Sequence, residues 1–270
     1  WRVSEGYRPD RLRISEFEGE DKARAEAGAD PLDRLVDHDR DGIEAEVIFP
    51  NKGLAMWATP DSKFAMAQCR VWNTWAWEVF GEHNARLSPV ASIATGDLEG
   101  SMAEIERTAK LGFRALTLPC KPVWGGHDVD HVNYNLPHFD PMWALIEETG
   151  MPITFHVSTG RDPRASRGNG GAIINYVTHS LAPTIEPVAN LCASGVLQRF
   201  PKIRFATIEA GIGWVPWLLT AMDEAYKKHH MWVRPKLDGL PSDYYRAHGF
   251  ATFQEDAAGI DLAEKHALAD

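Results

Sequence analysis

The chain has 270 residues, of which 44% are hydrophobic and 24% are charged, a composition typical of a folded globular protein and not of a disordered one. It contains no run of about 18 apolar residues, so the sequence predicts no membrane-spanning helix. The formal net charge of −10 disfavours binding to nucleic acid. It does not exclude an anionic substrate, because a metal ion or a local arginine can reverse the field inside a pocket.

The beginning of the chain and the cysteines bear on domain organisation and location. Residues 1–29 are polar and poorly periodic, which predicts a loop or a marginal helix, and they show no signal peptide. No repeat or low-complexity linker divides the chain, so we expect residues 1–270 to form a single domain. Cys69, Cys120 and Cys192 are far apart and odd in number, which favours free thiols and a cytoplasmic location.

From Asp30 onward, helices and strands are expected to alternate. Asp30 can cap a first helix over 31–41, which Gly42 ends. The elements that follow are, in chain order, a strand over 45–50, a helix over 64–83, a strand over 87–94, a helix over 97–111, a strand over 113–119, a helix over 141–149, a strand over 152–157, a mostly helical stretch over 181–200, a strand over 203–208, a helix over 214–230, a strand over 249–253 and a helix over 257–268.

This alternation predicts an α/β fold with a parallel sheet. The strands are continuous apolar runs, as expected when helices cover them. No strand is followed by a glycine-rich phosphate loop, so a (β/α) barrel is favoured over an open doubly wound sheet. The segment 161–176 contains several arginines and glycines and follows a strand, which indicates a lid or a binding loop.

In such a barrel the functional residues lie at the carboxyl ends of the strands. His156 ends the strand over 152–157 and could bind a metal or act as an acid or base; a core histidine is the alternative. Glu209 follows the strand over 203–208 and could move protons. The alternative for Glu209 is a structural carboxylate that binds the N-terminus of the next helix.

Several other residues are weaker candidates. His179 could reach the mouth of the pocket, although a lone loop histidine usually has no such role. Residues 126–131 contain two histidines with metal-like spacing, but their glycine-rich setting favours a loop. Asp140 is expected to cap a helix, and the acidic and basic residues around His38 are expected to form surface ion pairs. Trp72, Trp75 and Trp77 are expected in the core or at a subunit contact.

Four segments carry a resemblance to a known family. The stretch DRLVDHDRDGIEAEVIFP (33–50) resembles the second strand unit of the amidohydrolase-related family, which includes aminocarboxymuconate-semialdehyde decarboxylase. FHVSTG (155–160) resembles its metal-binding fifth strand and RFPKIRFATIEAGIGW (199–214) its sixth. LLTAMDEAY (218–226) is similar to the helix that follows.

The resemblance implies a metal-dependent TIM-like (β/α) barrel that hydrolyses or decarboxylates a small carboxylated substrate, aromatic ones included. It implies a divalent metal, zinc first and manganese second, with His156 as a ligand. We expect Glu209 and His179 to be catalytic, although the decarboxylases often carry a histidine at the position of Glu209. The pattern further suggests Arg161, Arg164 and Trp214 as substrate-binding residues.

This sequence departs from the family pattern at both ends. The family's first strand carries His-x-His or Glu-x-His and its last strand an aspartate ligand, and neither motif occurs here. The expected fold is therefore a barrel that lacks its first and last strands in this chain, with an incomplete metal site. We expect a homo-oligomer that binds neither nucleic acid nor a membrane. The alternative function is an inert scaffold that persists by self-association.

Overall fold

The computed structural model of the chain describes residues 19–20, 30–50, 53–122, 132–160, 166–229 and 235–268. Its centre is a set of parallel strands. β1 (Glu46–Ile48) pairs with β2 (Leu87–Pro89). A five-stranded sheet follows in the order β3 (Ala91–Ser92), β4 (Leu116–Thr117), β5 (Ile153–His156), β6 (Phe205–Ile208) and β7 (Gly249–Ala251).

The two ladders meet at Val90. β2 pairs with β1 and β3 pairs with β4, and the Val90 N–H between them donates to the carbonyl oxygen of Ile48 at 3.0 Å. The predicted strand over 87–94 is therefore one continuous element that changes partner along its length. All six predicted strands are present and lie side by side in chain order, with β1 and β7 at the two ends of the described ladders. Each is shorter than predicted, because backbone pairing with the neighbouring strands covers only part of each apolar run.

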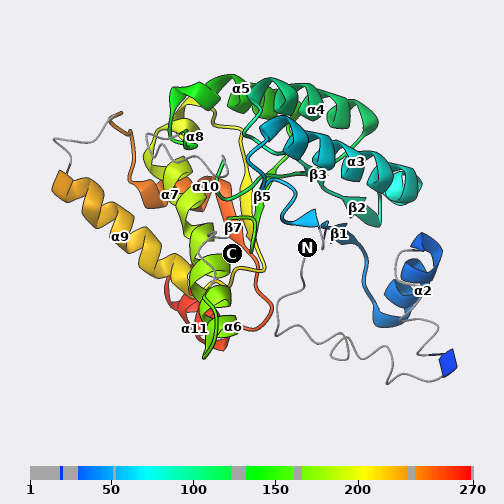
Figure 1. Ribbon diagram of the computed structural model, residues 1–270. Helices are drawn as coiled ribbons and strands as arrows, with labels where there is room; N and C mark the ends of the chain where they lie inside the picture. Colours follow the sequence, from blue (N-terminus) through cyan, green and yellow to red (C-terminus); the bar gives the residue numbers. More distant parts are fainter. Residues whose placement is uncertain are drawn as a thin grey trace.

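Helices lie around the strands (Figure 1). They are α2 (Pro31–Asp41), α3 (Ser62–Phe80), α4 (Leu98–Leu111), α5 (Asp140–Thr149), α7 (Ile185–Ala193), α9 (Trp214–His229), α10 (Pro241–His248) and α11 (Ala257–Lys265). The capping signals of α2 are confirmed: the Asp30 side chain accepts from two backbone N–H groups, and Gly42 ends the helix with a φ of 71°. The sequence patterns did not predict α10.

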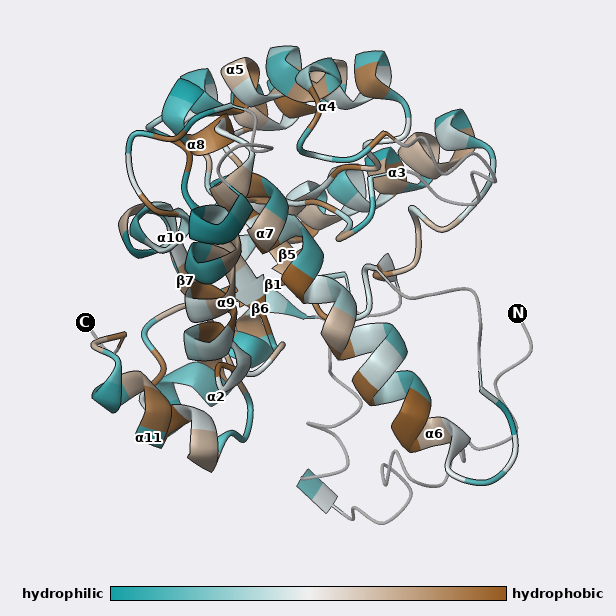
Figure 2. Cartoon of the chain, turned by 90° about the vertical axis from the view of Figure 1, so that its left-hand side faces the viewer, coloured by the Kyte–Doolittle hydropathy of each residue, from teal (hydrophilic) through white to brown (hydrophobic). Residues whose placement is uncertain are grey.

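The helical segment before α7 begins earlier than predicted. It starts with α6 (Gly171–Ile174), continues as a π-helix over Asn175–Leu181 and a 3₁₀ turn over Ala182–Thr184, and projects beyond the sheet (Figure 2). The predicted start of this helical stretch at residue 181 was therefore wrong, and the loop before it is shorter than expected. Pro183 interrupts the regular α-helical bonding, because it has no N–H to donate. A further short helix, α8 (Val196–Arg199), follows after Gly195.

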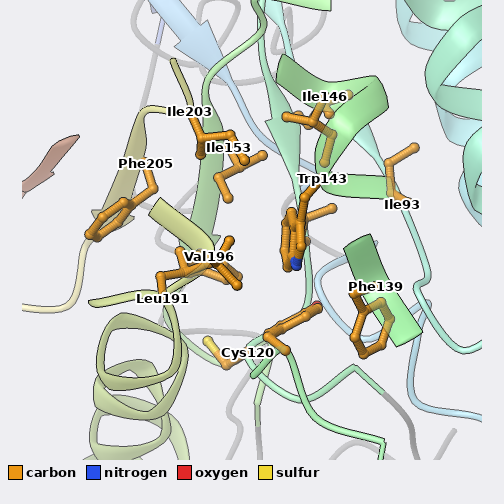
Figure 3. Close-up of a cluster of buried hydrophobic side chains, with 14 of the residues drawn as sticks. Ile93, Cys120, Phe139, Trp143, Ile146, Ile153, Leu191, Val196, Ile203 and Phe205 are labelled. Carbon is orange, nitrogen blue, oxygen red and sulfur yellow. The ribbon is translucent and has the colours of Figure 1, made fainter. Parts of the chain in front are cut away.

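The hydrophobic core lies between the sheet and α5, α7 and α8, with Trp143 near its centre (Figure 3).

The expectation that Asp140 caps α5 was wrong. A 3₁₀ turn over Pro137–Phe139 leads directly into α5, so Asp140 is its first residue, and its carboxylate accepts from Arg199 at 2.8 Å. Burial raises the pKa of the thiols of Cys69 and Cys120 to about 12. All three cysteines are free, as predicted.

Ion pairs attach α2 to the edge of the sheet. Arg86 binds Asp39 at 2.6 Å, which confirms the predicted surface ion pairs around His38. His38 differs from that expectation, because it is buried and its Nε2 lies 3.0 Å from the carboxylate of Glu46 on β1. Across the described ranges, no helix is long and apolar enough to cross a membrane.

Candidate functional site

His156 is the last residue of β5 and is almost completely buried, with 5% of the residue exposed. Its Nδ1 lies 2.9 Å from the carbonyl oxygen of Val157, an acceptor, so Nδ1 carries the proton and Nε2 keeps its lone pair in the neutral ring. The ring of Phe49, which follows β1, packs against the imidazole with centroids 4.9 Å apart. These contacts fix the ring with Nε2 free to bind.

The main chain around His156 is held by Thr159. The Thr159 hydroxyl donates to the carbonyl oxygen of His156 at 2.7 Å and accepts the backbone N–H of Cys120 at 3.2 Å. This bond joins the loop after β5 to the loop after β4. Ser158, which lies between His156 and Thr159 in the chain, adopts a left-handed conformation with a φ of 74°, which is unusual for a residue other than glycine.

Glu209 follows β6 and also has a left-handed backbone, with a φ of 56°. Such a conformation costs a side-chain-bearing residue about 1 kcal/mol or more, and it recurs at functional sites. The Glu209 N–H donates to the Thr252 hydroxyl after β7 at 3.0 Å, which holds the turn in place. The side chain is 44% exposed, so it is partly buried.

The two residues that the sequence placed at adjacent strand ends lie together. His156 pairs with Ile208 across β5 and β6, and its Nε2 is 3.8 Å from Oε2 of Glu209. The alternative role considered for Glu209 was that of a structural carboxylate bound to the N-terminus of the next helix. Asp256 has that role instead. The Asp256 carboxylate accepts the backbone N–H groups of Ile212 and Gly213 before α9 at 2.7 and 2.8 Å. The Glu209 carboxylate therefore remains available to face the histidine.

Asp256 also accepts from the N–H of Gly259 at 2.8 Å and caps α11. Burial by itself would raise the pKa of the Asp256 carboxyl, but the three backbone N–H groups outweigh it and hold that pKa below its usual value. Asp256 thus ties the loop after β7 to the loop after β6. The sequence did not single out this residue: its cap of α11 is local, but Ile212 and Gly213 lie more than 40 positions away along the chain.

An open groove of about 850 Å³ begins at Glu209. Trp214, a predicted substrate-binding residue, lines it, and its indole N–H is held by the carbonyl oxygen of Ala210 at 2.9 Å. Tyr176 and Leu181 line the groove from the π-helix. The remaining lining comes from the loops after β6 and β7: Ala210, Gly211, Gly213, Gln254, Glu255 and Asp256.

His179, another predicted site residue, is not joined to this pair in the described part of the chain. His179 lies in the π-helix, half-buried, and its Nδ1 has no hydrogen-bond partner. No hydrogen bond or ion pair within the described ranges connects it to His156 or Glu209. Arg161 and Arg164 lie outside the described residues, as do the two histidines of 126–131.

The pair fits a divalent metal in part. Two ligands about 2.1 Å from one ion in a tetrahedral arrangement are about 3.4 Å apart, close to the observed separation of His156 Nε2 and Glu209 Oε2. A zinc site uses three or four ligands. Among the described residues, no cluster of three histidine, cysteine or acidic side chains could hold a metal. The described part therefore supplies an oriented histidine and one carboxylate, and not a complete site.

The amidohydrolase family profile matches residues 12–270. No curated protein matches in sequence. Among solved structures, an amidohydrolase from Mycobacterium avium subsp. paratuberculosis K-10 superposes with a TM-score of 0.72 at 19% identity over 92% of this chain and 64% of its own length.

Two decarboxylases are also similar. 5-Carboxyvanillate decarboxylase LigW from Sphingomonas paucimobilis gives a TM-score of 0.66 at 22% identity, covering 87% of this chain and 68% of that one. A dihydroxybenzoic acid decarboxylase from Polaromonas sp. JS666, with bound manganese and the inhibitor 2-nitroresorcinol, gives 0.62 at 19% identity, covering 90% and 74%. This chain thus spans about two thirds to three quarters of their length. The predicted class of fold, a metal-dependent hydrolase-type barrel, is confirmed, although the described strands do not themselves form a closed barrel.

Proposed function

Because the chain belongs to the amidohydrolase family, a family of enzymes, we propose that it takes part in the metal-dependent decarboxylation of a small aromatic carboxylate. The observation that carries this proposal is the pair of His156 and Glu209. Their functional atoms lie 3.8 Å apart at the carboxyl ends of neighbouring parallel strands, where barrel enzymes carry their chemistry. The groove beside them is large enough for a small molecule.

His156 would hold a divalent ion, manganese or zinc, through Nε2, together with ligands from outside the described residues. When bound, such an ion polarises substrate oxygens and stabilises negative charge. The proposal draws support from the manganese in the Polaromonas decarboxylase, and from the contact of Phe49 and the bond to Val157 that orient the imidazole.

Glu209 would move the proton. In its protonated form it donates from Oε2 to the ring carbon that bears the carboxylate. The bond between that carbon and the carboxylate then breaks, its electron pair returns to the ring, and carbon dioxide leaves. Glu209 takes up one proton from solvent to begin the next cycle, so the net reaction consumes one proton for each carbon dioxide released. His179 remains a second candidate for proton transfer.

The substrate ring would lie against the groove beside Glu209. Trp214 and Tyr176 offer aromatic surfaces there, and stacking on such surfaces suits an aromatic substrate. The described lining contains carboxylates and no arginine or lysine, so a substrate carboxylate needs a positive partner from elsewhere. We assign that role to the bound metal and to Arg161 or Arg164, whose guanidinium groups can bind a carboxylate through two hydrogen bonds.

Hydrolysis is the second candidate, and one specific observation favours it. Glu209 stands where the decarboxylases that the sequence resembles often carry a histidine. A carboxylate beside a metal-binding histidine can also accept a proton from an attacking water.

The three free, buried cysteines support a cytoplasmic location for either activity.

The test is turnover of 5-carboxyvanillate and dihydroxybenzoates by the chain after loading with manganese or zinc. We expect carbon dioxide and the decarboxylated ring, and a loss of about 100-fold or more in kcat for Glu209→Gln, as for removal of a general acid. Glu255→Gln is the matched control, since Glu255 lines the same groove and Glu209 is the carboxylate that lies near His156. Release of an amide or ester product without carbon dioxide would favour hydrolysis.

Metal content distinguishes the enzyme from the inert scaffold. Elemental mass spectrometry after desalting should find about one equivalent of metal, and His156→Ala should lower that content. A chain that retains no metal and turns over no substrate would contradict the proposal and favour the scaffold.

A further inference from the structure

The outward face of α3 is unusually apolar. Phe64 is 56% exposed, Val71 70% and Trp75 42%, and the exposed Ala67 lies between them. At 100° per residue these four side chains form one stripe along the helix, opposite the buried side that packs on the sheet. Figure 1 places α3 on the periphery of the molecule beside α4. Large exposed side chains gathered in one stripe mark an interaction surface.

Trp75 is held in place before any partner arrives. Its ring packs against Trp72 at a tilt of 42° with centroids 5.3 Å apart, and it meets Phe80 edge to face at 5.9 Å. Trp72 is itself fixed, because its indole N–H donates to the carbonyl oxygen of Val90 at 3.1 Å. A tryptophan already ordered in the free protein loses little entropy on binding, which is typical of residues that dominate the affinity of an interface.

The charges at the two ends of the stripe are opposite in sign. Lys63 stands exposed at its beginning and Glu78 at its end, and neither forms an ion pair within the described part of the chain. Arg70 flanks the centre, but its charge is matched by Glu104 at 3.3 Å. The stripe is therefore positive at one end, apolar in the middle and negative at the other end.

We propose that this face binds the same face of a second copy of the chain, with the two α3 helices antiparallel about a two-fold axis near residues 70 and 71. Lys63 and Glu78 are separated by about 22 Å along the helix, so this arrangement brings Lys63 of each copy to Glu78 of the other. Val71 lies at the axis, and Trp75 packs beside Ala67 of the second copy. An isologous contact of this kind requires a self-complementary surface, and the charge pattern of α3 is self-complementary.

Sedimentation velocity of the chain over about 1–100 µM, the range of weak complexes, tests this proposal. We expect a dimer whose population rises with concentration. Val71→Glu should abolish it, because two carboxylates would meet at the axis. Lys63→Glu should weaken it about tenfold by opposing Glu78, and the double variant Lys63→Glu with Glu78→Lys should restore it by exchanging the charges.

Val36→Glu is the matched control. Val36 is 65% exposed on α2, close to the exposure of Val71, and its substitution should leave the dimer unchanged. A chain that stays monomeric at every concentration overturns the proposal. A dimer that survives both Val71→Glu and Lys63→Glu overturns it as well, because contact would then occur through another surface. Circular dichroism should show that these exposed substitutions leave the fold intact.

Discussion

His156 and Glu209 face each other across β5 and β6, with 3.8 Å between Nε2 and Oε2. A histidine at the end of a strand is aimed by the strand itself, since side chains alternate between the two faces of a sheet. Glu209 lies beyond the end of β6 and needs a different device. Its left-handed backbone, with a φ of 56°, turns the chain at this point and places the carboxylate beside the imidazole.

This strain should be measurable. Glu209→Gly removes the side chain that disfavours a positive φ, and we expect the protein to gain about 0.5–1 kcal/mol in free energy of unfolding while it loses activity. Glu209→Gln retains a side chain at the same φ and should show no such gain, which makes it the control. Urea denaturation of both variants gives the comparison. A destabilised Glu209→Gly protein would show that the side chain contributes more through its contacts than it costs in strain.

Asp256→Ala should destabilise the chain by about 2 kcal/mol, because it removes the cap of α11 and leaves the N–H groups of Ile212 and Gly213 without their acceptor. Glu255→Ala is the control, and it should change stability by less than about 0.5 kcal/mol, as most surface substitutions do. Thermal unfolding of the two variants tests the difference.

The Asp256 contribution should also depend on pH in a defined direction. The folded-state pKa lies below the ordinary value, so this contribution is present above the unfolded pKa of about 3.9 and is lost as the pH falls through the lower folded pKa. The stability difference between the wild type and Asp256→Ala should therefore shrink in that acidic window and remain constant near neutral pH. A difference that grows on acidification would contradict this assignment.

Gly160→Ala should disturb the loop that follows His156. A Cβ at residue 160 would lie 2.5 Å from the Cβ of Cys120 and 2.9 Å from that of Pro183, and neither atom can move without the main chain. We expect a loss of about 1–3 kcal/mol, as for other overpacked core sites. Gly96→Ala is a milder comparison, because its nearest neighbour is the Cβ of Ser62 at 3.2 Å. Equal stability of the two variants would mean that the loop after β5 yields easily.

Glu104→Ala tests the buried polar network behind α3 and α4. The Glu104 carboxylate is buried and accepts from Arg107 at 2.6 Å and from Asn73 at 2.9 Å. Its removal should cost about 2–3 kcal/mol, because the buried Asn73 and the mostly buried Arg107 each lose a partner and Arg70 loses its ion pair. Glu106→Ala, which breaks only the exposed pair with Lys110 at 3.6 Å, should change stability by less than about 0.5 kcal/mol in the same urea titration.

The order of the elements could be read from the sequence because its signals are local. Asp30 and Gly42 mark the ends of α2, and apolar runs mark the six strands. The lengths of the strands could not be read, since a residue counts as paired only where a neighbouring strand offers a partner. The π-helix over Asn175–Leu181 was also missed, because the preceding arginines and glycines have the composition of a loop.

The sequence by itself determined the class of fold and selected His156 and Glu209, because their positions at strand ends follow from one-dimensional patterns. Only the tertiary structure decided that the two side chains meet. That contact depends on β5 and β6 being neighbours and on a left-handed turn held by Thr252. It also assigned Asp256 to the N-terminus of α9, which leaves Glu209 available. Contacts between residues distant in the chain form only when the whole sheet assembles, and no local pattern records them.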